Sequence, residues 1–392
     1  MRSEGDFIRL NEWLAPLSWL YGIAVRFRNQ LFDMGVLKSH SFDLPVISVG
    51  NITVGGSGKT PHVEYLVRLL KDKAKVAVLS RGYKRKSKGY VLAGKDSTTA
   101  QIGDEPYQMK CKFSDIYIAV DKKRKEGIER LMNDPETRDV EVIVLDDAFQ
   151  HRYVKPGLNI LLVDYHRLLI YDKLLPVGRL REPKEGKNRA DMVIVTKCPA
   201  DLKPMEFRVL TRAMELYPFQ SLYFTTLKYG RLKQMFGNRT MELKELSRKN
   251  VLLLTGIASP DQMMLDLRPY NKDIRHMEYG DHHQFTEQDV HDVEQAFNEL
   301  EPPRIIITTE KDKTRLEHMR QLMGKEVCDS LYVLPVEIRF MLGKENEFNN
   351  KIIDYVRKNS RNSRLAQGKN DDKPHDGHHS GNRPGTISFR NN

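Results

Sequence analysis

Residues 44–70 constrain the fold of this 392-residue chain more than any other stretch. An apolar run at residues 44–49 is followed by the glycine-rich segment 50–60 and then by apolar residues at helical spacing up to Leu70. This order predicts a buried strand, a tight turn and a helix that begins near Lys59. A strand, a glycine-rich turn and a helix together form the phosphate-binding unit of many α/β nucleotide-binding proteins.

The glycine turn departs from the usual phosphate-loop pattern at one position. Thr53 stands where G-x-x-x-x-G-K-[ST] has its first glycine, whereas Gly58, Lys59 and Thr60 supply the end of the pattern. We expect backbone N–H groups to form an anion nest, Lys59 to reach the β- and γ-phosphates of ATP, and Thr60 to ligate Mg²⁺. The alternative is a glycine-rich hairpin. The predicted nucleotide contacts are Thr53, Val54, Gly55, Gly56, Ser57, Gly58, Lys59 and Thr60.

Two carboxylates follow a second apolar run. Residues 142–145 are Val-Ile-Val-Leu, and Asp146 and Asp147 come directly after them. A phosphate loop shares its Mg²⁺ with a carboxylate at the end of a neighbouring buried strand, so Asp146 is the predicted metal ligand. The alternative is that the two carboxylates cap a helix. Gln150 and His151 lie at the same strand end, where open α/β sheets bind ligands, and we expect them and Asp147 to contact substrate.

Similar apolar runs recur along the chain and predict a doubly wound α/β fold. The first set lies at residues 44–49, 76–79, 116–120, 142–145, 160–163 and 192–196, and the second at 222–227, 251–255, 305–308 and 331–338. Short runs that are apolar on both faces predict parallel strands joined by crossover helices. We therefore expect a nucleotide-binding core with a mostly parallel sheet at residues 39–220 and a second, smaller α/β lobe at residues 221–350.

The two ends of the chain predict different roles. Residues 13–25 are mostly apolar and contain both tryptophans, but they are too short to span a bilayer, which takes about 20 apolar residues. For the helix predicted within residues 1–38, two interpretations stay open: it packs on the core, or it lies amphipathically in a membrane interface, which the tryptophans favour. Residues 351–392 are predicted to be a disordered basic tail, because they are rich in polar and charged residues.

Composition excludes several classes of protein. The net charge is +11, but from Arg357 onward eight Lys and Arg face three Asp, so much of the excess lies in the predicted tail. No recognition motif accompanies this charge, and neither a nucleic-acid partner nor a protein partner is expected. The three cysteines form no CxxC pair, which argues against a disulfide framework and a zinc site.

Seven short motifs, in order, resemble the tetraacyldisaccharide 4'-kinase family, the lipid A 4'-kinases. They are VGNITVGGSGKTP at residues 49–61, SRGY at 80–83, GDEP at 103–106, DDAFQH at 146–151, LREP at 180–183, DHH at 281–283 and TEKD at 309–312. Ala148 is a departure, since the family usually has glycine there, and it matters little unless the backbone needs a positive φ.

The resemblance implies an activity. Members transfer the γ-phosphoryl group of ATP to the 4'-hydroxyl of a tetraacylated glucosamine disaccharide 1-phosphate, the lipid A precursor, and produce lipid IVA. The reaction takes place at the cytoplasmic face of the inner membrane, which implies a peripheral membrane enzyme. The alternative from another class is a membrane-associated P-loop ATPase or GTPase switch.

The resemblance also assigns roles by motif match. Lys59 and Asp104 are the implied catalytic residues, with Asp104 as the base, and the second lobe supplies His282, with His283 as the less favoured choice. Because Asp104 and His282 are far apart in sequence, the lobes must close before the reaction. Glu182 is implied as a further metal contact. For Arg81 and for residues 310–312, two roles stay open. Arg81 begins a basic patch that is either a solvated loop or a cradle for the anomeric phosphate, and residues 310–312 serve lobe closure or capping.

Overall fold

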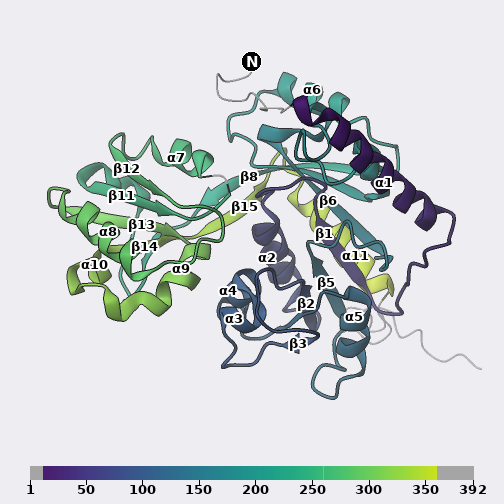
Figure 1. Cartoon of the computed structure of the whole chain (residues 1–392), viewed down its shortest axis with the longest axis horizontal. Coiled ribbons are helices and arrows are strands. Elements are labelled where there is room, and N and C mark those ends of the chain that lie inside the picture. Colours follow the sequence, from purple (N-terminus) through teal and green to yellow (C-terminus); the bar gives the residue numbers. More distant parts are fainter. Residues whose placement is uncertain (1–11, 259, 360–392) are drawn as a thin grey trace, which may run out of the picture.

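The computed structural model describes residues 12–258 and 260–359, which form two α/β lobes (Figure 1). Each lobe is built on a mostly parallel sheet whose central strands are buried on both faces. Because parallel strands need crossover connections, helices alternate with the strands and cover the sheets. The predicted class, a doubly wound core with a second, smaller α/β lobe, is confirmed.

The larger lobe contains a nine-stranded sheet. In spatial order its strands are β15 (Val336–Phe340), β8 (Ser221–Tyr229), β7 (Met192–Thr196), β6 (Leu158–Asp164), β1 (Val46–Gly50), β5 (Val142–Asp146), β2 (Val76–Ser80), β4 (Tyr117–Val120) and β3 (Val91–Leu92). The strands from β8 to β4 run parallel, and β15 and β3 are antiparallel additions at the edges. Val49 of β1 pairs with Asp146 of β5, so the turn after β1 and the carboxylates after β5 leave the sheet side by side.

Helices cover both faces of this sheet. One face is covered by α2 (Lys59–Leu70), α4 (Asp104–Lys112) and α11 (Glu345–Asn359), and the other by α5 (Arg124–Asn133) and α6 (Pro204–Met214). The short elements α3 (Thr99–Ile102), η2 (Tyr165–Arg167), η3 (Leu169–Tyr171) and η4 (Lys184–Arg189) complete the lobe. In α2 the apolar residues Val63, Leu66, Val67 and Leu70 recur at helical spacing, and all four are buried, as the sequence pattern predicts.

The smaller lobe contains a six-stranded sheet. In spatial order its strands are β10 (Thr240–Met241), β9 (Leu232–Gln234), β14 (Leu331–Leu334), β13 (Arg304–Thr309), β11 (Asn250–Thr255) and β12 (Ile274–Glu278). Its helices are α7 (Asp261–Leu267), α8 (Glu287–Asn298), α9 (Glu310–Leu316), α10 (Lys325–Ser330), η5 (Leu243–Arg248) and η6 (Glu317–Leu322). The short α9 begins directly after β13, at the edge of the sheet that faces the larger lobe (Figure 1).

Strands β8 and β15 join the two lobes (Figure 1). They pair antiparallel with Ile338 opposite Leu227, and beyond the pair Gly230 N–H donates to the Pro335 carbonyl at 3.0 Å. The predicted boundary at residue 220 therefore has to move, because β8 belongs to the larger sheet. The single strand predicted at residues 331–338 is wrong: the chain divides at Pro335, which has no N–H for a continuous ladder, into β14 of one sheet and β15 of the other.

The end of the described chain returns to the larger lobe. Helix α11 buries Phe348, Ile352 and Val356 in the core. The Tyr355 hydroxyl accepts from the Val46 N–H and donates to the Val46 carbonyl, each at 3.1 Å. The predicted tail therefore begins too early at residue 351, and its part from residue 360 onward lies outside the described residues.

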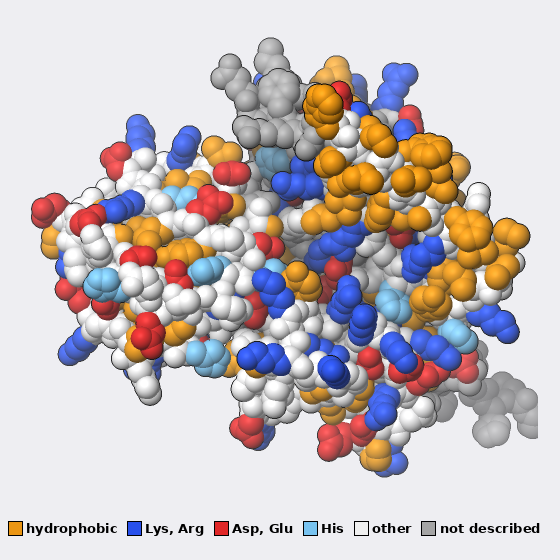
Figure 2. Space-filling model, viewed as in Figure 1, with side chains coloured by type: hydrophobic (Ala, Val, Ile, Leu, Met, Phe, Trp, Pro, Cys, Tyr) orange, Lys and Arg blue, Asp and Glu red, His pale blue; other side chains and the backbone are white. Residues whose placement is uncertain are grey.

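The predicted N-terminal helix is present as α1 (Ala15–Asp33), which follows the 3₁₀ turn η1 (Glu12–Leu14). One side of it packs on the larger lobe: Gly22 and Phe32 are buried, and the Ser18 hydroxyl donates to the Leu174 carbonyl at 2.9 Å. Apolar side chains gather on its outer side (Figure 2). The exposed ones include Leu17, Trp19, Leu20, Ile23 and Phe27, and Trp13 of η1 is exposed as well. None of the helices within residues 12–258 and 260–359 has the length and apolarity that crossing a membrane requires.

Candidate active site

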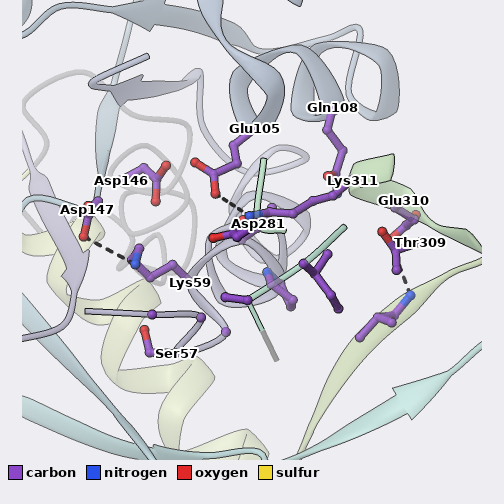
Figure 3. Close-up of a pocket in the computed structure, with 18 of the residues that line it drawn as sticks. Ser57, Lys59, Glu105, Gln108, Asp146, Asp147, Asp281, Thr309, Glu310 and Lys311 are labelled. Carbon is purple, nitrogen blue, oxygen red and sulfur yellow. Dashed lines mark hydrogen bonds and ion pairs between the residues drawn. The ribbon is translucent and has the colours of Figure 1, made fainter. Parts of the chain in front are cut away.

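A cavity of about 710 Å³ lies between the two lobes. The larger lobe lines it with the glycine turn and with residues at the ends of β2 and β5, and the smaller lobe lines it with loop residues and the start of α9. Figure 3 shows charged side chains converging on this space, including Lys59, Glu105, Asp146 and Lys311. The cavity lies beyond the carboxyl ends of the parallel strands, which is where open α/β sheets bind ligands.

The glycine turn between β1 and α2 is open toward the cavity. Gly55 and Gly58 have φ of 115° and 79°, values that strain any residue with a side chain. Helix α2 begins at Lys59, and none of the described side chains caps its first N–H groups. These donors and the positive end of the helix dipole are therefore available to an anion. All the predicted contacts from Val54 to Thr60 line the cavity.

Asp146 ends β5 as a fully buried carboxylate with an unused oxygen. The Ser80 hydroxyl donates to Oδ2 at 3.2 Å, while Oδ1 has no partner among the described residues. Burial, and then the charges of Glu105 and Asp147, raise the pKa of Asp146 to about 7. A buried, unpartnered carboxylate oxygen beside other carboxylates is a position that a cation would stabilise.

These donors fit Mg²⁺. The ion prefers oxygen ligands and commonly takes one or two from the protein and the rest from phosphate and water. Asp146 and Thr60 both line the cavity next to the glycine turn and supply a carboxylate and a hydroxyl. Among the described residues no group of three or more His, Cys, Asp or Glu side chains is placed as a metal cage.

Asp147 connects the turn to the neighbouring loop. Its Oδ1 lies 3.5 Å from Lys59 Nζ, and its Oδ2 lies 3.6 Å from Arg181. Arg181 in turn donates to Gln150 at 3.2 Å. Asp147 has a φ of 49°, so the strained position at this turn is the aspartate, and Ala148 after it does not need the glycine that the family usually has.

Asp104 and His282 meet across the lobe boundary. Asp104 begins α4, and His282 follows β12 at a φ of 59°. His282 Nδ1 lies 3.4 Å from Asp104 Oδ2, and Arg315 Nε lies 3.4 Å from the same oxygen. Burial alone would raise the pKa of Asp104, but the hydrogen bond from His282 and the charge of Arg315 outweigh it and lower that pKa. The carboxylate is therefore ionised at neutral pH.

The neighbouring histidine occupies a different environment. His283 Nε2 lies 2.9 Å from Asp289 Oδ2, and its ring stacks on Tyr279 with the centroids 4.7 Å apart. It does not line the cavity, whereas His282 does. Of the two histidines that the sequence left open, the geometry therefore brings His282 to Asp104.

Helices α4 and α9 hold the lobes together through further ion pairs. Lys311 Nζ lies 2.7 Å from Glu105, and burial opposes both charges, yet each partner keeps the other ionised: the pKa of Glu105 is lowered and that of Lys311 raised. Lys112 lies 2.7 Å from Glu64 and 2.8 Å from Glu310, which belong to different lobes. Both expectations for residues 310–312 therefore hold, since Thr309 and Asp312 also cap α9.

Besides Asp104, three predicted site residues do not line the cavity. Glu182 is buried and pairs with Arg189 at 2.6 Å, so its proposed place next to the metal is not reproduced. His151 Nε2 lies 3.3 Å from the Lys122 carbonyl. Thr53 bridges Leu180 through its backbone. In each case the motif marked the correct segment, but the side chain or the backbone is used for packing.

Two further predicted residues, Arg81 and Asp104, lie at the cavity or next to a residue that lines it, and two residues beside them were not predicted. Arg81 lines the cavity and is exposed, so it is available to an anionic substrate group. Asp104 is not itself part of the cavity wall and reaches it through His282. Neither Glu105, which adjoins Asp104, nor Arg315 was predicted from the sequence to belong to the site. An acidic residue within a motif and a basic residue one turn into α9 were the available signals.

Comparisons with known proteins all identify the same family. The family model described as tetraacyldisaccharide-1-P 4'-kinase matches residues 10–357. A tetraacyldisaccharide 4'-kinase from Phocaeicola vulgatus is 57% identical over 366 residues, 93% of this chain and 100% of the relative, and one from Porphyromonas gingivalis is 45% identical over 355 residues, 90% and 99%. A crystal structure of LpxK from Aquifex aeolicus, described as an "apo" form in complex with ATP, matches with a TM-score of 0.65 at 30% identity, covering 88% of this chain and 98% of that one.

Proposed function

The chain belongs to the tetraacyldisaccharide-1-P 4'-kinase family, a family of lipid A biosynthesis, and from this premise we propose its reaction. It transfers the γ-phosphoryl group of ATP to the 4'-hydroxyl of a tetraacylated glucosamine disaccharide 1-phosphate, and the products are lipid IVA and ADP. The observation that carries the proposal is the meeting of Asp104 and His282, from opposite lobes, at a cavity that the phosphate loop also lines.

The phosphate loop, residues 53–60, would hold the triphosphate. Its N–H groups at the start of α2 are uncapped, and Lys59 reaches into the cavity, where Asp147 is its partner. Phosphoryl transfer needs mainly positioning and neutralisation of charge around the γ-phosphate. Lys59 would stabilise the charge that develops on the transferring group, and Asp146 and Thr60 would hold Mg²⁺, which when bound would neutralise negative charge on the phosphates.

Asp104 and His282 would activate the acceptor. The 4'-oxygen forms a bond to the γ-phosphorus while the bond to the β,γ-bridging oxygen breaks, and the hydroxyl proton has to leave. Asp104 is ionised, and it is hydrogen-bonded to His282, which lines the cavity. A carboxylate that orients a histidine can share the proton load of a general base.

The enzyme would act at the cytoplasmic face of the inner membrane as a peripheral protein. Its substrate carries four acyl chains, and each CH₂ exposed to water costs about 0.8 kcal/mol, so the enzyme has to reach the lipid at the bilayer surface. The outer side of α1 supplies apolar side chains, with Trp19 65% exposed and Phe27 60% exposed, and Trp13 in the preceding turn η1 is 94% exposed. Tryptophan and phenylalanine on such a side suit the headgroup level.

The test is a labelling experiment on the full chain. [γ-³²P]ATP is incubated with Mg²⁺ and the disaccharide 1-phosphate in mixed micelles, and the lipid fraction is separated by thin-layer chromatography. We expect one new labelled lipid with one added phosphate, and no transfer to an acceptor whose 4'-position is already phosphorylated.

Two results would contradict the proposal. Label on the 4'-blocked acceptor would mean that another hydroxyl is used. Release of labelled phosphate that is independent of the lipid, without any labelled lipid, would favour the membrane-associated ATPase or GTPase switch instead.

A further inference from the structure

The phosphate loop is held from behind by two side chains of the larger sheet. The hydroxyl of Thr196, at the end of β7, donates to the Ser57 carbonyl at 3.0 Å. Deeper in the core, His62 lies one turn into α2 and is only 3% exposed. Its two ring nitrogens connect the phosphate loop to β8, one of the two strands that join the lobes.

The hydrogen bonds of His62 define a single tautomer. Nδ1 lies 2.7 Å from the Gly58 carbonyl, and because a carbonyl can only accept, Nδ1 carries the proton and donates. Nε2 lies 3.0 Å from Thr225 Oγ1, so Nε2 accepts and the threonine hydroxyl donates. The ring is neutral at physiological pH, since burial lowers the pKa of His62 to about 4.

The bond to Gly58 acts on the start of α2. The Gly58 carbonyl receives only a long bond of 3.4 Å from the backbone N–H of His62, so the ring supplies its short partner. The Gly58 carbonyl and the Lys59 N–H belong to one peptide plane. A ring that fixes the carbonyl therefore also fixes the direction of the Lys59 N–H. Gly58 itself has a positive φ of 79° and, lacking a side chain, depends on its neighbours to hold this conformation.

The bond to Thr225 extends this control to the linker between the lobes. Thr225 lies in β8 and pairs with Phe340 of β15. Further along the same strand, Leu227 and Tyr229 line the cavity. His62 thus lies between the phosphate loop and a strand that continues into the smaller lobe.

We propose that His62 is a positioning residue that orients the Gly58–Lys59 peptide for phosphate binding, and that Thr225 ties this orientation to β8. Neither side chain touches the nucleotide. The inference rests on the proposed function, because it takes the loop to bind the phosphates of ATP. It adds that the grip on these phosphates depends on a buried contact with the linker between the lobes.

The experiment measures ATP affinity by calorimetry and steady-state kinetics with full-length variants. His62→Leu removes both hydrogen bonds, and Thr225→Val removes only the hydroxyl at nearly constant shape. His62→Asn retains an amide donor near the Gly58 carbonyl, and Thr225→Ser retains the hydroxyl. Thr226→Val is the matched control, because Thr226 is also buried in β8 but successive strand residues point to opposite faces.

We expect His62→Leu to raise the dissociation constant for ATP by about tenfold and Thr225→Val by about threefold, as expected for the loss of buried hydrogen bonds. His62→Asn should recover part of the affinity, and Thr225→Ser and Thr226→Val should stay near the unmodified protein. The KM for ATP should rise more than kcat falls, because the chemical groups are untouched. A general loss of stability would not give this split or this rescue.

Several outcomes overturn the inference. ATP binding by Thr225→Val and His62→Asn at the unmodified affinity would do so even if His62→Leu failed to fold. An equal loss in Thr225→Val and Thr226→Val would also do so. In ¹⁵N spectra of the full chain, His62 should show a protonated Nδ1 and an unprotonated Nε2, and the opposite tautomer would contradict the geometry. Failure of the unmodified protein to bind ATP would instead refute the proposed function.

Discussion

The two sides of the cavity are built in different ways. The larger lobe presents a glycine turn and strand-end carboxylates whose positions follow from the pairing of β1 with β5. The smaller lobe presents side chains from the loop after β12 and from α9, which reach across to residues of α4. The proposed phosphate site is therefore built by one lobe alone, whereas the proposed site for acceptor activation would need both lobes in contact.

The contacts that join the lobes are also of two kinds, backbone hydrogen bonds and side-chain ion pairs. The β8–β15 pair is held by backbone hydrogen bonds and can persist when the lobes separate. The α4–α9 contacts are ion pairs between side chains, and they would be lost if the lobes separated. Rigid-body closure about a short linker is a common way to assemble a catalytic site around its substrate.

The largest expected effect is a loss of lipid phosphorylation without a loss of ATP binding. Asp104→Asn keeps the shape but removes the base, so kcat for lipid phosphorylation should fall by about 10³-fold. ATP affinity, measured by calorimetry, should change little because the phosphate loop is intact. Turnover near that of the unmodified enzyme would remove Asp104 from this role.

A pair of histidine variants sharpens the same point. His282→Asn should lower kcat strongly, whereas His283→Asn should keep most of the activity, because His283 pairs with Asp289 away from the cavity. The reverse ranking would show that the geometry of the two histidines misassigns the site.

The next effect separates function from stability on the nucleotide side. Asp146→Asn should lower kcat/KM by about 10²-fold through loss of the metal carboxylate. Its pKa is raised from 3.8 to about 7, so ionisation opposes folding, and this penalty grows as the pH rises from about 4 to about 7 and stays constant above. In metal-free buffer at pH 8 the variant should therefore be more stable by about 4 kcal/mol, and the gain should vanish near pH 4.

Denaturant unfolding at several pH values, with EDTA present, measures this gain. Asp115→Asn is the contrasting control, because a hydrogen bond from Lys71 lowers the pKa of Asp115, so its loss should not stabilise the protein at pH 8. An Asp146→Asn protein that is less stable than the unmodified one at pH 8 would contradict this prediction. It would show that other groups of the folded protein already offset the cost of burying the charge of Asp146.

Much of the larger lobe follows from local sequence. The runs at residues 76–79, 142–145 and 192–196 are strands β2, β5 and β7, because strands buried on both faces need continuous apolar residues. The phosphate loop was equally clear, since glycines at Gly55 and Gly58 meet a backbone requirement that can be recognised from the residue type.

Long-range pairing could not be predicted in this way. Leu227 and Ile338 pair although they are 111 positions apart in the chain (338 − 227), and nothing local shows that β8 and β15 both belong to the larger sheet. The apolar run on either side of Pro335 resembles one strand, although its two halves enter different sheets. The division depends on tertiary contacts that outweigh local propensity.

The site shows the same limit. Asp104 and His282 were connected only through the family resemblance, and the Arg315 that holds the carboxylate was not anticipated, since three segments have to fold before these side chains meet. The pairing of Glu182 with Arg189 could not be read from its motif either, and its role as a metal contact stays a prediction.

A smaller effect tests whether the exposed apolar residues of α1 bind the bilayer surface. Leu17→Ser, Leu20→Ser and Phe27→Ser together remove exposed apolar surface from α1, so binding to vesicles of phosphatidylethanolamine and phosphatidylglycerol should weaken by about tenfold. Sedimentation with the vesicles measures this. Leu322→Ser with Leu342→Ser, also exposed leucines, is the control and should bind as before. Unchanged binding by the α1 variant would leave α1 as a packing helix only.

The smallest effect concerns closure itself. Glu310→Gln removes one ion pair between the lobes, while Lys112 keeps Glu64 as a partner at 2.7 Å. Partly exposed pairs contribute up to about 1 kcal/mol, so kcat/KM for the lipid should fall by about threefold, with ATP affinity unchanged. Glu299→Gln breaks the exposed Arg275–Glu299 pair within the smaller lobe and should leave both values alone. If Glu310→Gln weakened ATP binding as much as lipid turnover, the two sides of the cavity would be energetically linked, and the phosphate site would require both lobes.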